Sequence, residues 1–234
     1  RDRPNVQTQD PDIRINIHIY KNTCTVSLDS SGNSLHQRGY RILTNIAPIN
    51  EVLAAGLLLK SGWDGETDFF DPMCGSGTFL IEAAMIACNI PVNINRESYA
   101  FMHWNDYDAE LHDKIVDASL KKVREFHHKI IGYDKAPSAV RKAQENVEHA
   151  NLSDYITVER KDFFRADKPI EGKLHMLFNP PYGERLPIDM EIFYGRIGDT
   201  FKKVYPGTDA WLITSNLEAL KHIGLKTSKR IKTF

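Results

Sequence analysis

Four residues that could bind a planar amine, Asn179-Pro180-Pro181-Tyr182, follow an apolar segment (residues 174–178) that we expect to form a buried strand. Two consecutive prolines lack backbone donors and have a fixed φ, so they hold the carbonyl groups of the turn in a rigid display. Asn179 Oδ1 and the Pro180 carbonyl could then accept the two N–H bonds of an NH2 group, while the Tyr182 ring stacks on its face. A rigid turn without chemistry explains the same four residues, so the motif needs support from elsewhere in the chain.

A glycine-containing loop upstream could bind a second ligand. It reads Asp71-Pro72-Met73-Cys74-Gly75-Ser76-Gly77-Thr78 and lies between an expected strand (67–70) and an expected helix (78–88). Glycines let a backbone approach a ligand closely, and a helix N-terminus offers unpaired N–H groups. Leu80 replaces the third glycine of a dinucleotide-binding fingerprint, and no P-loop Lys follows, so neither of those nucleotide sites is expected. Asp71 would repel a phosphate but suits a cationic amino-acid group.

Two more expected strands end at acidic residues. Residues 130–134 end at Asp134, and residues 156–161 are followed by Asp162 and Phe163. In doubly wound folds, a carboxylate at the end of the second strand accepts hydrogen bonds from ribose hydroxyls, whereas Asp162 and Phe163 could contact the edge and the face of an adenine. Each acidic residue taken singly is more often a helix cap. The four strand ends together, with amino-acid, ribose, adenine and amine-binding chemistry, indicate S-adenosylmethionine (SAM) beside a planar amine.

The loop at 71–78 and residues 179–182, which continue as Gly183-Glu184-Arg185-Leu186, resemble the amine-methylating branch of the class I SAM-dependent methyltransferases. More narrowly, the chain is similar to the bacterial THUMP-domain methyltransferases that modify guanine N2 in large-subunit (23S) rRNA. Residues 34–41, 47–51 and 95–104 also match that family, and the similarity runs from about residue 12 to the end. The resemblance implies that Asn179, Pro180, Pro181 and Tyr182 are the catalytic residues. It also implies SAM as the cofactor, with contacts from Pro48, Asn50, Asp71, Pro72, Cys74, Gly75, Ser76, Gly77, Thr78, Asp134, Asp162, Phe163 and Asn179.

The expected reaction is methyl transfer from the SAM sulfonium to the exocyclic N2 amine of a guanine that is unstacked from RNA. Asn179 is no strong base, so preorganised acceptors and proximity would carry most of the rate. Residues 179–182 alone do not separate guanine N2 in rRNA from guanine N2 in tRNA, adenine N6 or the glutamine amide of a release factor. Residues 183–186 and a THUMP-like hairpin argue against a release factor, and an intact SAM loop argues against a non-catalytic RNA-binding module.

The order of the expected elements indicates an α/β fold. The resemblance implies a Rossmann-like class I SAM-dependent methyltransferase sheet with strand order 3-2-1-4-5-(7)-6. We expect the fifth strand at residues 210–214 and a basic sixth strand at residues 225–232. The seventh strand would follow Phe234, so we expect this sheet to be truncated.

Two domains are expected, with a boundary near residue 43. Residues 1–43 would hold a linker and the C-terminal remnant of a THUMP-like domain, a β-hairpin whose strands flank Lys21-Asn22. Residues 44–234 would form the methyltransferase domain, which begins with a linker at 44–48 and a helix at 49–61 that ends before a glycine.

An insertion at about residues 90–129 separates the glycine loop from the ribose carboxylate. Asp134 therefore lies much farther from Gly77 than the about 20 residues usual in doubly wound folds, and the resemblance expects such an insertion. Its apolar residues recur at three- and four-residue steps, which predicts an amphipathic helix with one face in the core. They are Leu111, Ile115, Val116, Leu120, Val123 and Phe126.

The net charge of −1 over 234 residues offers no excess of cations for binding phosphates. We therefore expect most phosphate affinity in a THUMP domain, with local RNA contacts from Arg38, Arg41, Lys226, Lys229 and Arg230. The three cysteines are not at metal or redox spacing and the nine histidines form no ligand pattern, so no metal is expected. Unpaired cysteines, no signal-peptide pattern and no apolar stretch of roughly 18 residues favour a cytoplasmic protein without a membrane partner.

Overall fold

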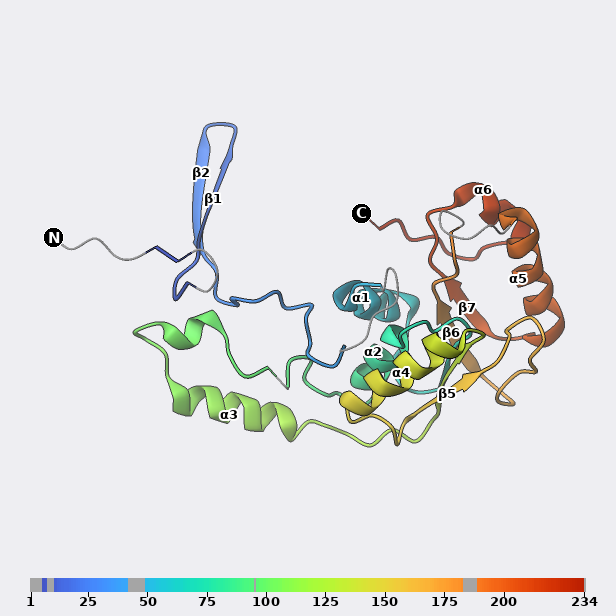
Figure 1. Cartoon of the computed structure of the whole chain (residues 1–234), viewed down its shortest axis with the longest axis horizontal. Coiled ribbons are helices and arrows are strands. Elements are labelled where there is room, and N and C mark those ends of the chain that lie inside the picture. The colour runs from blue at the N-terminus through green and yellow to red at the C-terminus, as the bar shows by residue number, and fades with distance from the viewer. Residues whose placement is uncertain (1–5, 8–10, 42–48, 95, 183–188, 234) are drawn as a thin grey trace. The chain divides into compact units, whose positions relative to one another are not determined.

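The computed structural model describes residues 6–7, 11–41, 49–94, 96–182 and 189–233. They belong to two compact units, which Figure 1 draws in one view. Unit 1 combines residues 1–39 with 90–123, and unit 2 combines residues 40–89 with 124–234. Most of the expected insertion therefore belongs to unit 1 with the N-terminal residues. The expected linker at 44–48, which includes the predicted SAM contact Pro48, and the motif at 183–186 lie outside the described residues.

Unit 1 contains the expected N-terminal hairpin. β1 (Ile15–Tyr20) pairs antiparallel with β2 (Thr23–Leu28). The turn between them has Lys21 at φ 44° and Asn22 at φ 61°, and two positive φ values let a two-residue turn follow the twist of its strands. One face of the hairpin is apolar and exposed, with the side chains of Ile15, Ile17, Ile19, Cys24, Val26 and Leu28.

The insertion forms α3 (Ala109–Leu120), which is preceded by the short 3-10 helix η1 (Ala100–His103). Asp108 caps α3 by accepting a hydrogen bond from the Leu111 amide. The prediction that this helix has a core face is wrong, because the described residues leave the face uncovered. Periodicity identifies the face of a helix that could be buried, whereas burial requires a second element packed against it. Four apolar side chains on this face of α3 are 39–56% exposed, and they are Leu111, Ile115, Val116 and Leu120. The other two predicted residues lie beyond the end of α3: Val123 is exposed, whereas Phe126 is buried as predicted.

Unit 2 is built on a sheet of five parallel strands in the order β5-β4-β3-β6-β7. The strands are β3 (Asp68–Asp71), β4 (Ile130–Asp134), β5 (Ile156–Arg160), β6 (Leu174–Phe178) and β7 (Asp209–Leu212). Counted along the sheet this is 3-2-1-4-5, which confirms the expected α/β sheet up to its fifth strand. The strand order reverses between β3 and β6, and ligands of such folds bind at the carboxyl ends of the strands near that point.

Helices cover both faces of this sheet. The helices of unit 2 are α1 (Glu51–Ser61), α2 (Thr78–Ala87), α4 (Pro137–His149), α5 (Met190–Val204), α6 (Leu217–Leu220) and the 3-10 helix η2 (Lys221–Ile223). Gly132 in β4 faces α2 so closely that a Cβ atom there would lie 2.4 Å from Leu80 Cδ1. Its neighbours Ile131 and Tyr133 point to the other face, because strand residues alternate, and they share a core with Phe193 of α5. No helix in the described part of the chain is long and apolar enough to cross a membrane.

A histidine is buried near the amino ends of the strands. His175 in β6 is 7% exposed, and its Nε2 lies 2.8 Å from Ser61 Oγ. The Ser61 hydroxyl donates to the Leu58 carbonyl at 2.7 Å, so His175 Nε2 carries the proton of their shared hydrogen bond. Burial lowers the pKa of His175, although the charge of Asp209 raises it in part. His175 is therefore a neutral core residue, remote from the carboxyl ends of the strands.

Residues 225–232 form no strand, so the prediction of a basic sixth strand is wrong. In the expected order the sixth strand pairs with the seventh and not with the fifth. No described strand is hydrogen-bonded to the outer edge of β7. A segment without a neighbouring strand has no partner for the inter-strand hydrogen bonds of its N–H and C=O groups. A strand-like composition alone therefore does not make it a strand.

Candidate functional site

The carboxyl ends of four neighbouring strands bring the predicted polar residues to one edge of the sheet. Asp71 ends β3 and Asp134 ends β4, while Asp162 follows β5 and Asn179 follows β6. Hydrogen bonds tie the first two strand ends together. The Cys74 amide donates to the Tyr133 carbonyl at 2.9 Å, and the Gly75 amide donates to Asp134 Oδ2 at 3.1 Å. The sheet order and these bonds thus assemble the residues that the sequence places far apart.

The loop between β3 and α2 depends on its two glycines. Gly75 has φ 57° and Gly77 has φ 83°, both in the left-handed region that favours glycine. A Cβ atom on Gly77 would also lie 3.3 Å from the Ala143 Cβ of α4. Gly77 is the N-cap residue of α2, and no side chain caps that helix. The unpaired N–H groups of its first turn are therefore left for a ligand.

Asp71 is a buried carboxylate beneath this loop. It is 2% exposed, and its Oδ1 accepts one hydrogen bond from the Met73 amide at 3.0 Å. Burial raises the pKa of Asp71 well above its usual range, and the charge of Asp134 adds to that rise. A positive group close to the site would offset both effects, because an opposite charge favours the ionised form of a carboxylate.

Asp134 has acceptor capacity on both of its carboxylate oxygens. Oδ1 accepts from the Ala136 amide at 2.9 Å and Oδ2 accepts from the Gly75 amide. Burial raises the pKa of Asp134, whereas these backbone N–H groups lower it in part. Asp134 is not the N-cap of α4, which is Ala136. Each oxygen keeps a further lone pair, which fits two neighbouring hydroxyl groups.

Asp162 and Phe163 point in different directions. Asp162 Oδ1 accepts a hydrogen bond from the Phe164 amide at 3.0 Å, and Oδ2 lies 3.9 Å from Arg165 Nε. Phe163 is 3% exposed, and its ring packs in the core 5.5 Å from the Tyr205 ring. The prediction that the Phe163 ring covers an adenine face is therefore wrong, because the ring is buried among other core aromatic side chains.

The turn after β6 is half-buried. The Tyr182 hydroxyl donates a hydrogen bond to Asn179 Oδ1, and Asn216 Nδ2 donates to the Tyr182 carbonyl at 3.2 Å. Burial raises the pKa of Tyr182, and the nearby Tyr194 adds to the rise, so the hydroxyl stays protonated. The amide oxygen that was predicted to accept from the target amine thus already accepts from Tyr182, and one lone pair remains. Sequence reasoning missed Asn216, whose only local signal is that of a helix cap.

Of the two arginines near residue 40 that were predicted to contact RNA, Arg38 is buried and Arg41 is partly buried. Arg38 is 8% exposed. Arg41 Nη2 donates to the Ile49 carbonyl and to Thr78 Oγ1, both at 2.8 Å, and Arg41 Nε lies 3.4 Å from Glu51 Oε1. Arg41 therefore links the first residues of α1 and α2. Burial argues against Arg38 as an RNA contact, and these internal partners argue against Arg41.

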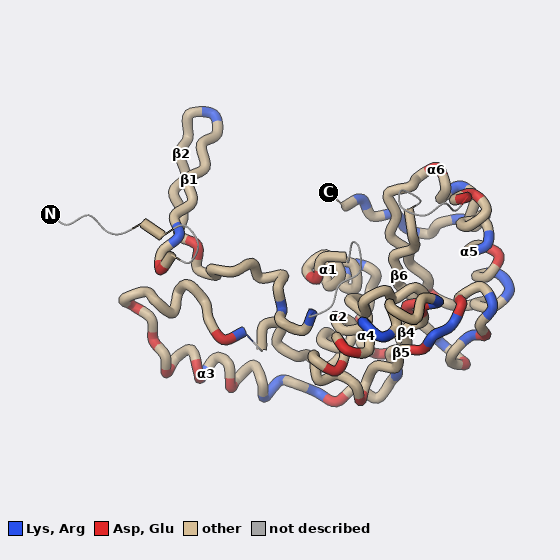
Figure 2. Tube along the Cα trace, in the orientation of Figure 1, with Lys and Arg blue, Asp and Glu red and all other residues tan. Residues whose placement is uncertain are grey.

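Asn50 has a structural partner as well. Its Oδ1 caps α1 by accepting from the amides of Val52 and Leu53, at 2.9 Å and 3.2 Å. The predicted contact of Asn50 to SAM would therefore be made by its Nδ2 atom. The predicted RNA contacts near the C-terminus, in contrast, are exposed, and they are Lys226, Lys229 and Arg230. Figure 2 colours the Lys and Arg positions along the chain blue.

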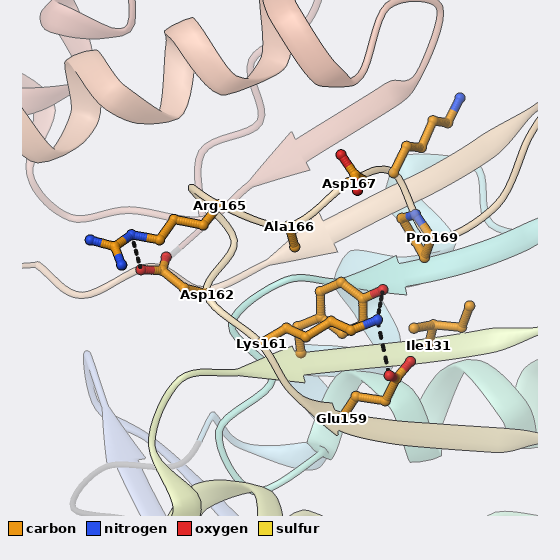
Figure 3. A pocket seen from close by; sticks show the side chains of 10 residues that line it. Ile131, Glu159, Lys161, Asp162, Arg165, Ala166, Asp167 and Pro169 are labelled. Atoms are coloured by element: carbon orange, nitrogen blue, oxygen red, sulfur yellow. Dashed lines mark hydrogen bonds and ion pairs between the residues drawn. The ribbon is translucent and has the colours of Figure 1, made fainter.

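A cavity of about 570 Å³ lies beside β4 and β5, on the sheet face that carries the α5 core (Figure 3). Among the described residues, Asp162 is the one predicted SAM contact that lines it. Lys161 Nζ lies 3.2 Å from the Tyr133 hydroxyl and 3.0 Å from Glu159 Oε2. Two of the ion pairs at the cavity, Lys161 with Glu159 and Arg165 with Asp162, join lining residues to one another. The cavity is not the center of the candidate site, since it is lined mainly by residues other than the predicted SAM contacts.

Comparisons with protein families agree with this geometry. The model of the RMKL-like methyltransferase domain matches residues 38–234, and the model of the THUMP domain matches residues 1–29. The ribosomal RNA large subunit methyltransferase K/L of Cellvibrio japonicus is 37% identical over 253 residues, which cover 99% of this chain and 33% of that protein. The protein of the same name from Shewanella pealeana is 37% identical, over 98% of this chain and 33% of its own length. The chain thus spans about a third of the length of these relatives.

Solved structures share the fold. SMU.472, crystallised with SAH and described as a methyltransferase, has a TM-score of 0.83 and 32% identity over 93% of this chain and 57% of its own. A protein described as a predicted N6-adenine-specific DNA methylase from Listeria monocytogenes has a TM-score of 0.85 and 31% identity, with the same coverage of 93% and 57%. TrmN from Thermus thermophilus has a TM-score of 0.61 at 17% identity, which indicates a common fold. From the family match and the identity to its relatives, this chain belongs to the RMKL-like methyltransferase domains.

Proposed function

We propose that this chain transfers a methyl group from SAM to the exocyclic N2 amine of a guanine in large-subunit rRNA. The observation that carries the proposal is the convergence of Asp71, Asp134, Asp162 and Asn179 on one edge of the sheet, where the strand order reverses. Ligands of doubly wound folds bind at that edge. The family match supplies independent support for methyl transfer.

The residues at this edge fit SAM. A cationic amino-acid group would offset the cost of burying the Asp71 carboxylate. Gly75 and Gly77 let the backbone approach that group, and the free lone pairs of Asp134 suit the ribose hydroxyls. Asp162 Oδ2 remains as an acceptor for the adenine amine. When bound, SAM supplies a methyl group that is activated by a positive sulfonium. SMU.472, whose structure contains SAH, supports this assignment.

The proposed amine site consists of acceptors at the turn after β6. Asn179 Oδ1 has one lone pair left, and the Pro180 carbonyl provides a second acceptor for the two N–H bonds of the amine. Acceptors on both hydrogens favour a pyramidal nitrogen whose lone pair points at the methyl carbon. These groups move no proton themselves, so positioning and electrostatics supply the rate. The Tyr182 ring would replace the stacking that the base loses when it leaves the RNA.

The choice of rRNA rests on the relatives, whereas the choice of guanine N2 rests on the resemblance of residues 71–78 and 179–186 to the THUMP-domain guanine-N2 methyltransferases. The curated proteins of 37% identity are named for large-subunit ribosomal RNA, and a THUMP model matches residues 1–29. The second candidate is adenine N6, because a structure at 31% identity is described as an N6-adenine-specific DNA methylase. Guanine N2 in tRNA and the release-factor glutamine are further planar amines. We propose a boundary at residues 43/44 between the THUMP remnant and the methyltransferase domain, and action on RNA in the cytoplasm.

Transfer of a tritiated methyl group tests the substrate class. The chain is incubated with labelled SAM and, in parallel, with unmodified rRNA, tRNA, DNA and release factor. Label in rRNA that digests to N2-methylguanosine is the expected result. Label in N6-methyladenine or in protein would replace guanine as the target, and Asn179→Ala serves as the inactive control. No transfer to any substrate, with SAM bound in calorimetry, would overturn the proposed reaction but not the cofactor.

A further inference from the structure

The segment that follows β7 lies along the candidate catalytic turn and is bonded to it. The Ile213 amide donates to the Phe178 carbonyl at 3.1 Å, immediately before the turn. Asn216 Nδ2 donates to the carbonyl of Tyr182, the last residue of the turn, at 3.2 Å. The chain is therefore held on both sides of Asn179 by residues that are distant from it in the sequence.

Asn216 is itself fixed by hydrogen bonds. Its amide donates to Thr214 Oγ1 at 3.0 Å, and its Oδ1 accepts from the Ala219 amide at 2.9 Å, which caps α6. Thr214 Oγ1 lies 2.7 Å from the hydroxyl of Tyr194, a fully buried residue of α5. A continuous chain of hydrogen bonds thus runs from the core under α5 to the carbonyl of Tyr182.

The two ends of the Asn216 amide have separate partners. Helix capping uses Oδ1 alone, and a Ser, Thr or Asp would serve that purpose equally well. The Nδ2 group plays no part in the cap. Its hydrogen bond goes to the Tyr182 carbonyl at the end of the turn. Tyr182 in turn donates its hydroxyl to Asn179 Oδ1. Moving the Tyr182 backbone would therefore shift both the ring that stacks on the base and the partner of the acceptor oxygen.

We propose that Asn216 is a positioning residue for methyl transfer, which holds the Tyr182 carbonyl through Nδ2 and so sets the place of the Tyr182 ring and of Asn179 Oδ1. This inference rests on the proposed role of residues 179–182 in binding the target amine. A misplacement of roughly 1 Å in a reacting geometry can cost about 10²-fold in rate. Loss of this bond should therefore lower kcat and leave the affinity for SAM unchanged.

Asn216→Asp is the informative substitution, because it keeps an oxygen to cap α6 but replaces the Nδ2 donor with a second acceptor facing the Tyr182 carbonyl. Asn216→Ser keeps a capping oxygen without adding charge. Glu218→Gln is the matched control, an exposed carboxylate-to-amide change in the same helix. We expect both Asn216 variants to lower single-turnover methyl transfer by about 10-fold to 100-fold, with SAM Kd, melting temperature and the Glu218→Gln rate unchanged.

Near-normal rates in both Asn216 variants would overturn the proposal. The proposal would also be overturned if the methyl-transfer rate, the SAM affinity and the melting temperature all fell together. That result would mean that Asn216 serves only as the structural cap of α6. Asn179→Ala, measured in parallel, distinguishes failure of the Asn216 proposal from failure of the proposed amine site at residues 179–182. If Asn179→Ala keeps normal turnover, the amine site at residues 179–182 is wrong. If Asn179→Ala is inactive while Asn216→Asp is normal, only the role of Asn216 is wrong.

Discussion

Replacing Asp134 with Ala tests the ribose contact most directly. Each Asp134 oxygen already accepts one backbone bond, from Ala136 at 2.9 Å and from Gly75 at 3.1 Å, which leaves a lone pair on each for a ribose hydroxyl. A hydrogen bond to a charged group contributes about 1.5–3 kcal/mol. Burial raises the pKa of Asp134, which means that its charged form is destabilised. We therefore expect each hydrogen bond to contribute a free energy at the lower end of this range. Two bonds at that lower end amount to about 3 kcal/mol, so SAM Kd should rise by on the order of 100-fold.

Isothermal titration calorimetry with two ligands makes the test specific. SAM and 5′-methylthioadenosine share the ribose and the adenine, but only SAM has the amino-acid group. Asp134→Ala should weaken both ligands by the same factor, and Asp154→Ala, which removes an exposed carboxylate, should weaken neither. Unchanged SAM affinity would remove Asp134 from the site. A loss with SAM alone would refute the ribose assignment and place Asp134 against the amino-acid group.

Asn179→Ala should lower kcat by roughly 10²–10³-fold, the effect of losing one preorganised polar partner, with a far smaller change in SAM affinity by calorimetry; near-normal turnover would leave residues 179–182 as a structural turn. RNA binding by residues 1–234 should be weak, with a slope of log K against log salt of about −0.7 per neutralised phosphate on single strands. Replacing Lys226, Lys229 and Arg230 with Ala should make that slope shallower in fluorescence anisotropy, and an unchanged slope would exclude them from the RNA contact. Burial lowers the pKa of His175, so the folded state binds fewer protons than the unfolded state. The contribution of neutral His175 to the free energy of unfolding is therefore fully present above the usual His pKa of about 6.5. It is lost as the pH falls from there through the pKa of the folded state. Urea midpoints should therefore decrease on acidification more in the wild type than in His175→Gln, and equal decreases would contradict this account.

Several elements could be predicted from the sequence because local interactions specify them. The strands at 130–134 and 174–178 have the expected bounds, since apolar runs of this length between turn residues form buried strands. The hairpin turn at Lys21-Asn22 has the expected place, and α1 ends at Ser61, directly before Gly62, whose φ of 88° suits a glycine that caps a helix C-terminus. The order of acidic strand ends also indicated the candidate site, because parallel strands present their carboxyl ends at one edge.

Only the tertiary structure decided which side chains are available at that edge. Arg41 looks like a surface cation in the sequence, yet it joins α1 to α2, and Phe163 turns into the core while Asp162 does not. Asn216 reads as a helix cap, and its second bond, to Tyr182, follows from how β7 lies beside β6. The apolar face of α3 shows the converse, since periodicity marks it but no described element covers it. Burial and long-range hydrogen bonds depend on residues that are distant in the chain, and a single sequence does not specify which of them will meet.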